Sequence, residues 1–306
     1  MLHNFIAALR ITSRGVKLIR LLLFLISLAP LLAMAEPPRV FVSVLPMKTF
    51  VEKIGGEHVE VHAMVQPGYS PATYDPTPQQ IAALAKAQLY IRTGVPFEQA
   101  WMKRMRSANP AMEVLDVRDG LELRSLETHA HDHRHEHGHG GDAGALDPHV
   151  WTSPSMVKQM AGRIRDRLAR LDPAHETDFS RNHDDFVAEL DRLDRDIHAL
   201  LDPLQQRRFM VFHPSWGYFA DDYGLVQVPI EHEGKQPGAR ALATLIEQAK
   251  AGRIRVLFVQ PQFDRRQARQ IADAIGGSVI AVDPLAPDYI DNLRKVARQF
   301  AEALQP

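Results

Sequence analysis

Cysteine is absent from this chain of 306 residues, so no disulfide can hold it together. The formal net charge is only -1, and nothing in that balance indicates nucleic-acid binding. No segment after residue 35 is apolar enough to span a membrane. The sequence motifs of serine hydrolases, P-loop proteins, zinc proteases and Rossmann dinucleotide sites are also missing. The chain must depend on a hydrophobic core, and about 270 residues after the leader are ample for one.

The first 35 residues have the three parts of a secretory signal peptide. Four basic residues come first, namely Arg10, Arg14, Lys17 and Arg20. An apolar run from Leu21 to Leu32 follows, and Ala33-Met34-Ala35 supplies a small-residue cleavage site. The run is short for a membrane span, although an uncleaved anchor is the alternative, and no cysteine follows it that could carry a lipid. We therefore expect an exported, soluble protein that begins at Glu36.

Short runs rich in β-branched residues alternate with helical patterns. The candidate strands are Val40–Leu45, Val59–Val65, Leu89–Thr93, Val114–Val117, Phe209–Phe212, Val226–Ile230, Val256–Val259 and Val279–Val282. The helical patterns include Pro78–Ala87, Phe97–Arg106, Ala239–Ala251, Arg265–Ile275 and Tyr289–Leu304. Proline follows several of the strands and marks where each leaves its sheet. The alternation predicts an α/β fold with parallel sheets and helices on both faces.

The middle of the chain has helical periodicity without strands. Ser153-Pro154 is an N-cap followed by proline at the first helical position, and that helix runs to Leu171. A second apolar stripe follows, made of Phe179, Phe186, Leu190, Leu193, Ile197 and Leu200. We predict a long connector helix over 173–202, between an N-terminal lobe (36–172) and a C-terminal lobe (203–306). An ordinary surface helix is the alternative.

Three side chains suited to metal binding fall where an open parallel sheet binds ligands, near the carboxyl ends of strands. His213 follows the candidate strand FMVF, Asp283 follows VIAV, and His149 lies in DPHVW just before a helix. Two imidazoles and one carboxylate suit zinc, and also manganese or iron(II). Alternatively, the histidines are structural residues and Asp283 is a turn residue. The segment Glu231-His232-Glu233 either lines the cleft or forms a plain loop.

Six histidines stand at alternate positions from 129 to 139, in the run HAHDHRHEHGHGG. So many imidazoles, with almost no apolar residues, cannot build a core. Glycines at 138, 140 and 141 argue against a strand. We interpret residues 129–141 as a metal-collecting loop, with a low-complexity insertion of no specific role as the alternative.

Six segments, taken in their order along the chain, resemble the metal-binding (zinc/manganese type) solute-binding proteins of bacterial ABC importers. They read PGYSPATYDPTPQQIAALAKAQLYIRTGVPFEQAW, DPHVWTSP, FHPSWGYFADDYGL, IEHEGKQPGARALATLIEQAK, LFVQPQFDRRQARQIADAIG and VDPL, and they extend from about Val40 to the C-terminus. The resemblance implies two α/β lobes joined by one long rigid helix, with a metal in the cleft. It also implies a periplasmic, non-enzymatic protein, which we expect to be a monomer, that docks on an inner-membrane permease driven by an ATPase.

The resemblance implies that the family's second, third and fourth metal ligands fall on His149, His213 and Asp283. The first ligand of the family lies in a segment of the form S-P-H-x-Y, which here reads Ser70-Pro71-Ala72-Thr73-Tyr74. Ala72 cannot bind a metal. Water, a loop imidazole, Glu231, Glu233 or Tyr74 could fill the open position. The loss of this histidine weakens the case for a tetrahedral site for bare zinc, and it leaves open that the ligand is a metal complex.

Capture of zinc and its delivery to an ABC permease is thus the leading hypothesis. A zinc-dependent hydrolase is one alternative, because two histidines, a carboxylate and an open position also describe a hydrolytic zinc site. A general base at a recognisable spacing is missing, since Glu231 is only a guess. A module that has lost bare-metal binding, and now holds another solute or acts as an adhesin, is the other alternative.

Overall fold

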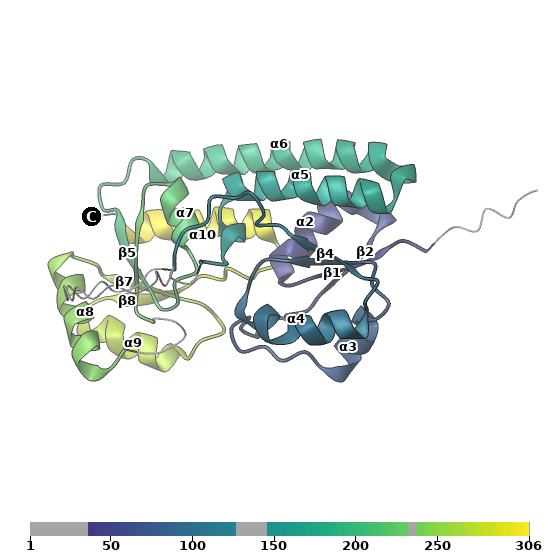
Figure 1. Ribbon diagram of the computed structural model, residues 1–306. Coiled ribbons are helices and arrows are strands. Elements are labelled where there is room, and N and C mark those ends of the chain that lie inside the picture. The colour runs from purple at the N-terminus through teal and green to yellow at the C-terminus, as the bar shows by residue number, and fades with distance from the viewer. Residues whose placement is uncertain (1–35, 127–145, 232–236, 306) are drawn as a thin grey trace, which may run out of the picture. The chain divides into compact units, whose positions relative to one another are not determined.

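The computed structural model describes residues 36–126, 146–231 and 237–305 (Figure 1). The signal-peptide segment 1–35 and the histidine-rich segment 129–141 lie outside these residues. Residues Pro37–Pro306 form one compact unit. Within the described residues, no helix is both long enough and apolar enough to cross a membrane.

Two parallel sheets of four strands each have the same topology. The N-terminal sheet has the order β2-β1-β3-β4 and consists of β1 (Arg39–Val42), β2 (Glu60–Ala63), β3 (Leu89–Arg92) and β4 (Glu113–Asp116). The C-terminal sheet has the order β6-β5-β7-β8 and consists of β5 (Arg208–Val211), β6 (Val226–Pro229), β7 (Val256–Val259) and β8 (Ser278–Ala281). In each sheet the strand order reverses between its first and third strands, and open α/β sheets bind ligands at such a switch point.

Helices cover both sheets (Figure 1). The described helices are α2 (Leu45–Gly55), α3 (Pro78–Leu84), α4 (Pro96–Ala108), α5 (Pro154–Leu171), α6 (Glu176–Leu201), α7 (Gly217–Asp222), α8 (Ala239–Ala251), α9 (Arg265–Ala274) and α10 (Tyr289–Ala303). Side-chain hydrogen bonds cap the N-termini of helices such as α3 and α5. Thr77 and Gln80 form a capping box at α3, and the Ser153 hydroxyl accepts from the backbone N–H of Met156 at α5.

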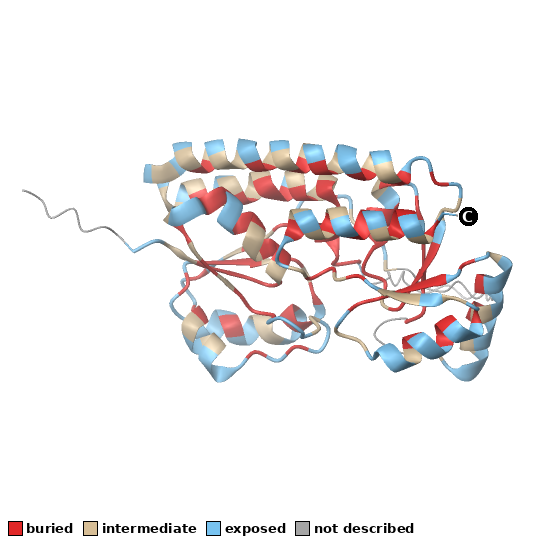
Figure 2. Cartoon of the chain, turned by 180° about the vertical axis from the view of Figure 1, so that it is seen from behind, coloured by how far each residue is buried: buried red, intermediate tan, exposed pale blue. Residues whose placement is uncertain are grey.

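The long helix α6 is the shared packing partner of both halves. It has 26 residues, follows a 3-10 turn at Pro173–His175, and contacts α5, α2 and α10. Its buried side chains are Phe179, Phe186, Leu190, Leu193, Ile197 and Leu201, and the opposite face is open to solvent (Figure 2). Leu201 is fully buried and the predicted stripe member Leu200 only partly so. The predicted α/β class with a long connector helix is confirmed.

All eight predicted strands form, with ends that differ by up to three residues. The expected end of the first strand at Leu45 is wrong, because β1 ends at Val42 and Leu45 begins α2. Pro46, interpreted as the end of a strand, lies in the first turn of that helix, where a missing N–H costs nothing. Helices α2 and α7 were not predicted.

Candidate metal site

A cavity of about 560 Å³ lies where loops from both sheets meet. Gly94 follows β3 in the N-terminal sheet, while His213 and Gln260 follow β5 and β7 in the C-terminal sheet. All three line the cavity, together with His149 and Ala72. The cavity therefore occupies the switch-point position expected for a ligand site in this class of fold.

His149 is held by a carboxylate two residues before it. It immediately precedes the 3-10 turn Val150–Thr152 and is 9% exposed. Oδ1 of Asp147 accepts from the backbone N–H of His149 at 2.9 Å and lies 2.7 Å from its Nδ1. A carboxylate only accepts, so Nδ1 carries the proton and Nε2 is left with a free lone pair. Imidazole metal ligands in proteins are oriented by such a carboxylate partner.

His213 has the same arrangement. Its Nδ1 lies 3.1 Å from Oε2 of Glu231, and Phe263 stacks on its ring with centroids 5.3 Å apart. The Gln260 amide donates to the backbone carbonyl of His213 at 2.7 Å and so fixes the loop. Burial lowers the pKa of His213 below 6.5, against the opposing effect of Glu231. The imidazole therefore stays neutral near pH 7, the state that binds metal.

With both rings neutral and each Nδ1 donating to its carboxylate, the two imidazoles face one another through unprotonated nitrogens. Nε2 of His149 and Nε2 of His213 are 3.4 Å apart. Two nitrogens bound at about 2.0–2.1 Å to a tetrahedral zinc ion are separated by about 3.3–3.4 Å. Two lone pairs at this distance repel each other, and a cation between them would turn the repulsion into attraction. The pair therefore has the spacing expected of two adjacent ligands of one ion.

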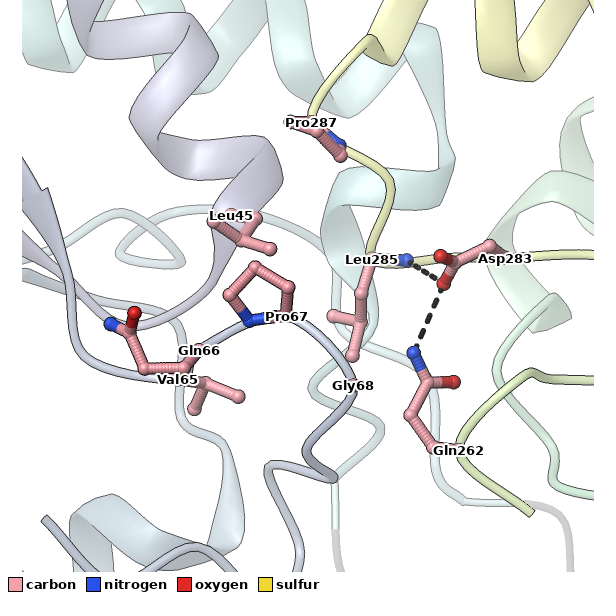
Figure 3. Close-up of a pocket in the computed structure, with 9 residues that line it drawn as sticks. All are labelled: Leu45, Val65, Gln66, Pro67, Gly68, Gln262, Asp283, Leu285 and Pro287. Atoms are coloured by element: carbon pink, nitrogen blue, oxygen red, sulfur yellow. Dashed lines mark hydrogen bonds between the residues drawn. The ribbon is translucent and has the colours of Figure 1, made fainter. Parts of the chain in front are cut away.

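Asp283 occupies a neighbouring cavity of about 60 Å³ (Figure 3). Its Oδ1 accepts from the Gln262 amide at 3.2 Å and from the backbone N–H of Leu285 at 2.9 Å. Gln262 and Leu285 line both cavities. Among the described residues, no three His, Cys, Asp or Glu side chains are grouped so that they could hold a metal. The structure thus brings together two of the three predicted ligands, whereas Asp283 lines the neighbouring cavity instead.

The candidate replacements for the missing ligand have other roles. Ala72 lines the large cavity, so the family's first ligand position does face the site. The Tyr74 hydroxyl is buried and donates to Gln80. Glu231 lies behind His213 and orients it. Glu233 falls outside the described residues.

Sequence reasoning missed Asp147 and Gln260. Both act through a histidine, one by its ring and the other by its backbone. The spacing in DPHVW contained a signal for Asp147, because a carboxylate two residues from a histidine can reach its ring.

Comparison with known proteins identifies the family. Residues 40–303 match the family described as "Zinc-uptake complex component A periplasmic". The high-affinity zinc uptake system protein ZnuA of Bacillus subtilis (strain 168) is 30% identical over 78% of this chain and 76% of its own length. A putative metal-binding protein of Chlamydia trachomatis is 23% identical over 86% of this chain and 90% of its own.

A solved structure of ZnuA superposes with a TM-score of 0.80 at 40% identity, and covers 88% of this chain and 99% of that one. A deletion mutant of ZnuA with zinc bound aligns equally well. The hydrolase and adhesin alternatives are not favoured, because a family match over most of the chain points to transport. The chain therefore belongs to the zinc-uptake component A family, the metal-binding solute-binding proteins of ABC importers, and is a transport protein rather than an enzyme.

Proposed function

We propose that this protein takes up zinc between His149 and His213, with Asp283 as a third ligand, and hands the ion to a permease driven by an ATPase. The single observation that carries the proposal is the facing pair of Nε2 atoms, 3.4 Å apart. Each imidazole has its Nδ1 on a carboxylate, so both free nitrogens are oriented before an ion arrives.

Zinc fits this pair better than manganese does. Imidazole nitrogen suits zinc, whereas manganese prefers a shell rich in carboxylate and water oxygens. The separation of the nitrogens is also that of tetrahedral coordination, the usual geometry of zinc in proteins. Manganese is therefore the right comparison ion in a binding experiment.

Asp283 can join the ion only if its side chain moves. Its Oδ1 is held by the Gln262 amide and the N–H of Leu285, in the smaller cavity that shares these two residues with the large one. Gln262 also lines the large cavity, so exchange of that one hydrogen bond for a metal bond would carry the carboxylate toward the imidazoles. We propose this exchange as part of ion capture.

The histidine-rich segment 129–141 would collect zinc for the cavity. Leu126 and Leu146, the described residues on either side of the gap, both line that cavity. Ser125 and Leu146 form an antiparallel bridge, and the N–H of Asp147 donates to the carbonyl of Arg124 at 3.0 Å. The described residues that flank the gap thus line the same cavity as His149. Fast, weak exchange at the imidazoles of the segment would raise the local concentration of the ion.

Export by a cleaved leader is the remaining part of the proposal. Residues 1–35 would direct the chain across the inner membrane, and the mature protein would act as a monomer in the periplasm. Mass determination of the mature protein from a native host tests the cleavage after Ala35, and a mass that retains the leader would contradict it.

Titration calorimetry on chelator-stripped protein tests the site. We expect His149→Ala and His213→Ala each to weaken zinc binding by at least about 100-fold, and Asp283→Asn to weaken it by about 10-fold. His198→Ala is the matched control, because His198 is a half-exposed histidine on α6 that pairs with Asp202. Unchanged zinc binding in both imidazole variants would reject the site.

A further inference from the structure

We propose that the zinc ion arrives as a chelate, bound to a small, flat, bidentate organic ligand that fills the cavity beside His149 and His213. The inference rests on the proposed function, since it assigns the chemical class of the species held at the same two imidazoles. Three observations carry it: the size of the cavity, the lack of further metal donors among its described lining residues, and the character of its wall.

The cavity is much larger than a bare ion needs. Its volume is about 560 Å³. A water molecule occupies about 30 Å³, so an ion completed by two waters would leave most of the space unused. Sites for small organic molecules have volumes of about 300–1,000 Å³.

The described residues that line the cavity lack the donors that would complete a zinc shell. The two imidazoles supply two positions of about four. Ala72 offers a methyl group where the family's first ligand stands. None of the described residues that line the cavity is Asp, Glu, Cys, Lys or Arg. The Gln260 amide nitrogen already donates to His213 and Ser215. A bidentate partner would supply the two bonds that the imidazoles leave open, and Asp283 would join as a fifth ligand only after its side chain moves.

The wall selects an apolar, planar partner. Asp147 and Glu231 stand behind the imidazoles, and their two negative charges offset the two positive charges of the ion. The organic part therefore needs little charge of its own. Trp151 meets His149 edge-on with centroids 5.3 Å apart, and Phe263 stacks on His213. Flat rings pack well against such surfaces, whereas the free carboxylates of a polycarboxylate would lose hydration without a Lys or Arg partner among the described lining residues.

Native mass spectrometry of the mature chain with zinc alone, zinc picolinate and zinc citrate tests the proposal. Picolinate is planar and binds through one nitrogen and one oxygen, whereas citrate is a flexible polycarboxylate. We expect to observe the mass of protein plus zinc plus picolinate. The dissociation constant of zinc should be about 10-fold lower with picolinate than without it. We expect no retained citrate.

Substitution at the position of the missing ligand gives the second test. Ala72→His adds a third imidazole and fills part of the cavity, so it should tighten binding of zinc alone by at least about 10-fold and abolish picolinate retention. Ala251→His, at the exposed end of α8, is the matched control and should change neither result.

Two outcomes would overturn the chelate while leaving zinc capture intact. In one, picolinate only competes, so that zinc occupancy falls and no ternary mass appears. In the other, binding of zinc alone is tight and is lost when residues 129–141 are deleted, which would assign the missing donors to that segment. If the protein retains zinc in none of the three arms, the proposed function itself is rejected.

Discussion

Asp147 reaches His149 twice with one oxygen. Its Oδ1 accepts the backbone N–H at 2.9 Å and meets the ring Nδ1 at 2.7 Å, so the same carboxylate orients the backbone and the imidazole. The side chain of Asp147 is only 3% exposed. Its negative charge therefore acts on the ring with little screening by water and holds the ring in one orientation.

Asp147→Asn should weaken zinc binding by about 10- to 100-fold, because a neutral amide oxygen is a poorer partner for Nδ1. Competition against a fluorescent zinc chelator measures the change. Asp185→Asn, at an exposed position on α6, is the control and should bind as the parent does. Equal affinity in the parent and both variants would remove Asp147 from the site.

Glu98 should make stability depend on pH. Its side chain is fully buried near the start of α4, where it accepts from Ser43 and from the backbone N–H groups of Thr93 and Gly94. Burial raises the pKa of Glu98 above 4.5, against these hydrogen bonds and Arg92. Between 4.5 and that higher pKa, the folded chain binds more protons than the unfolded chain.

The free energy of unfolding should therefore fall as the pH rises through that window. We expect the parent to lose stability relative to Glu98→Gln between pH 4.5 and 7, measured by urea unfolding at each pH. Glu302→Gln, an exposed residue on α10, should track the parent throughout. A difference between the parent and Glu98→Gln that stays constant with pH would contradict the raised pKa.

Trp151 connects the segment of His149 with that of Asp283. Its indole N–H donates to the carbonyl of Pro284 at 2.7 Å, and both residues are buried. Trp151→Phe leaves that carbonyl without its donor and should cost about 1–3 kcal/mol in the free energy of unfolding. Trp101→Phe, which removes an exposed bond to Asp75, should cost less than about 1 kcal/mol. Urea unfolding that shows equal losses would argue against a special role for the buried bond.

Phe186 anchors the long helix in the core. It is 1% exposed and packs against Phe50 of α2 with ring centroids 5.7 Å apart. Phe186→Ala should lower the free energy of unfolding by about 3–5 kcal/mol, because the truncation leaves a cavity. Asp185→Ala, its exposed neighbour, should stay within about 0.5 kcal/mol. A small effect at Phe186 in urea unfolding would mean that α6 relaxes to fill the space.

Central strands such as β7 were predictable because their β-branched runs are buried on both faces, whereas β4 and β8 are less buried and were found from composition alone. Helix α2 was missed because proline suits both the end of a strand and the first turn of a helix. The positions of His149 and His213 followed from the ends of their elements. Their separation did not, since it depends on how segments 64 residues apart pack together. The orientation of the Asp283 carboxylate depends on its hydrogen bonds with Gln262 and Leu285, which no sequence pattern predicts.

Helix α6 has a further consequence for the chain as a whole. Its buried face belongs to one hydrophobic cluster that includes Val40 of β1 and Phe258 of β7. Either half, expressed without this helix, would expose the apolar surface that α6 covers in the whole chain. The two lobes are thus separate in their sheets but share one hydrophobic core. We expect fragments cut between them not to fold on their own.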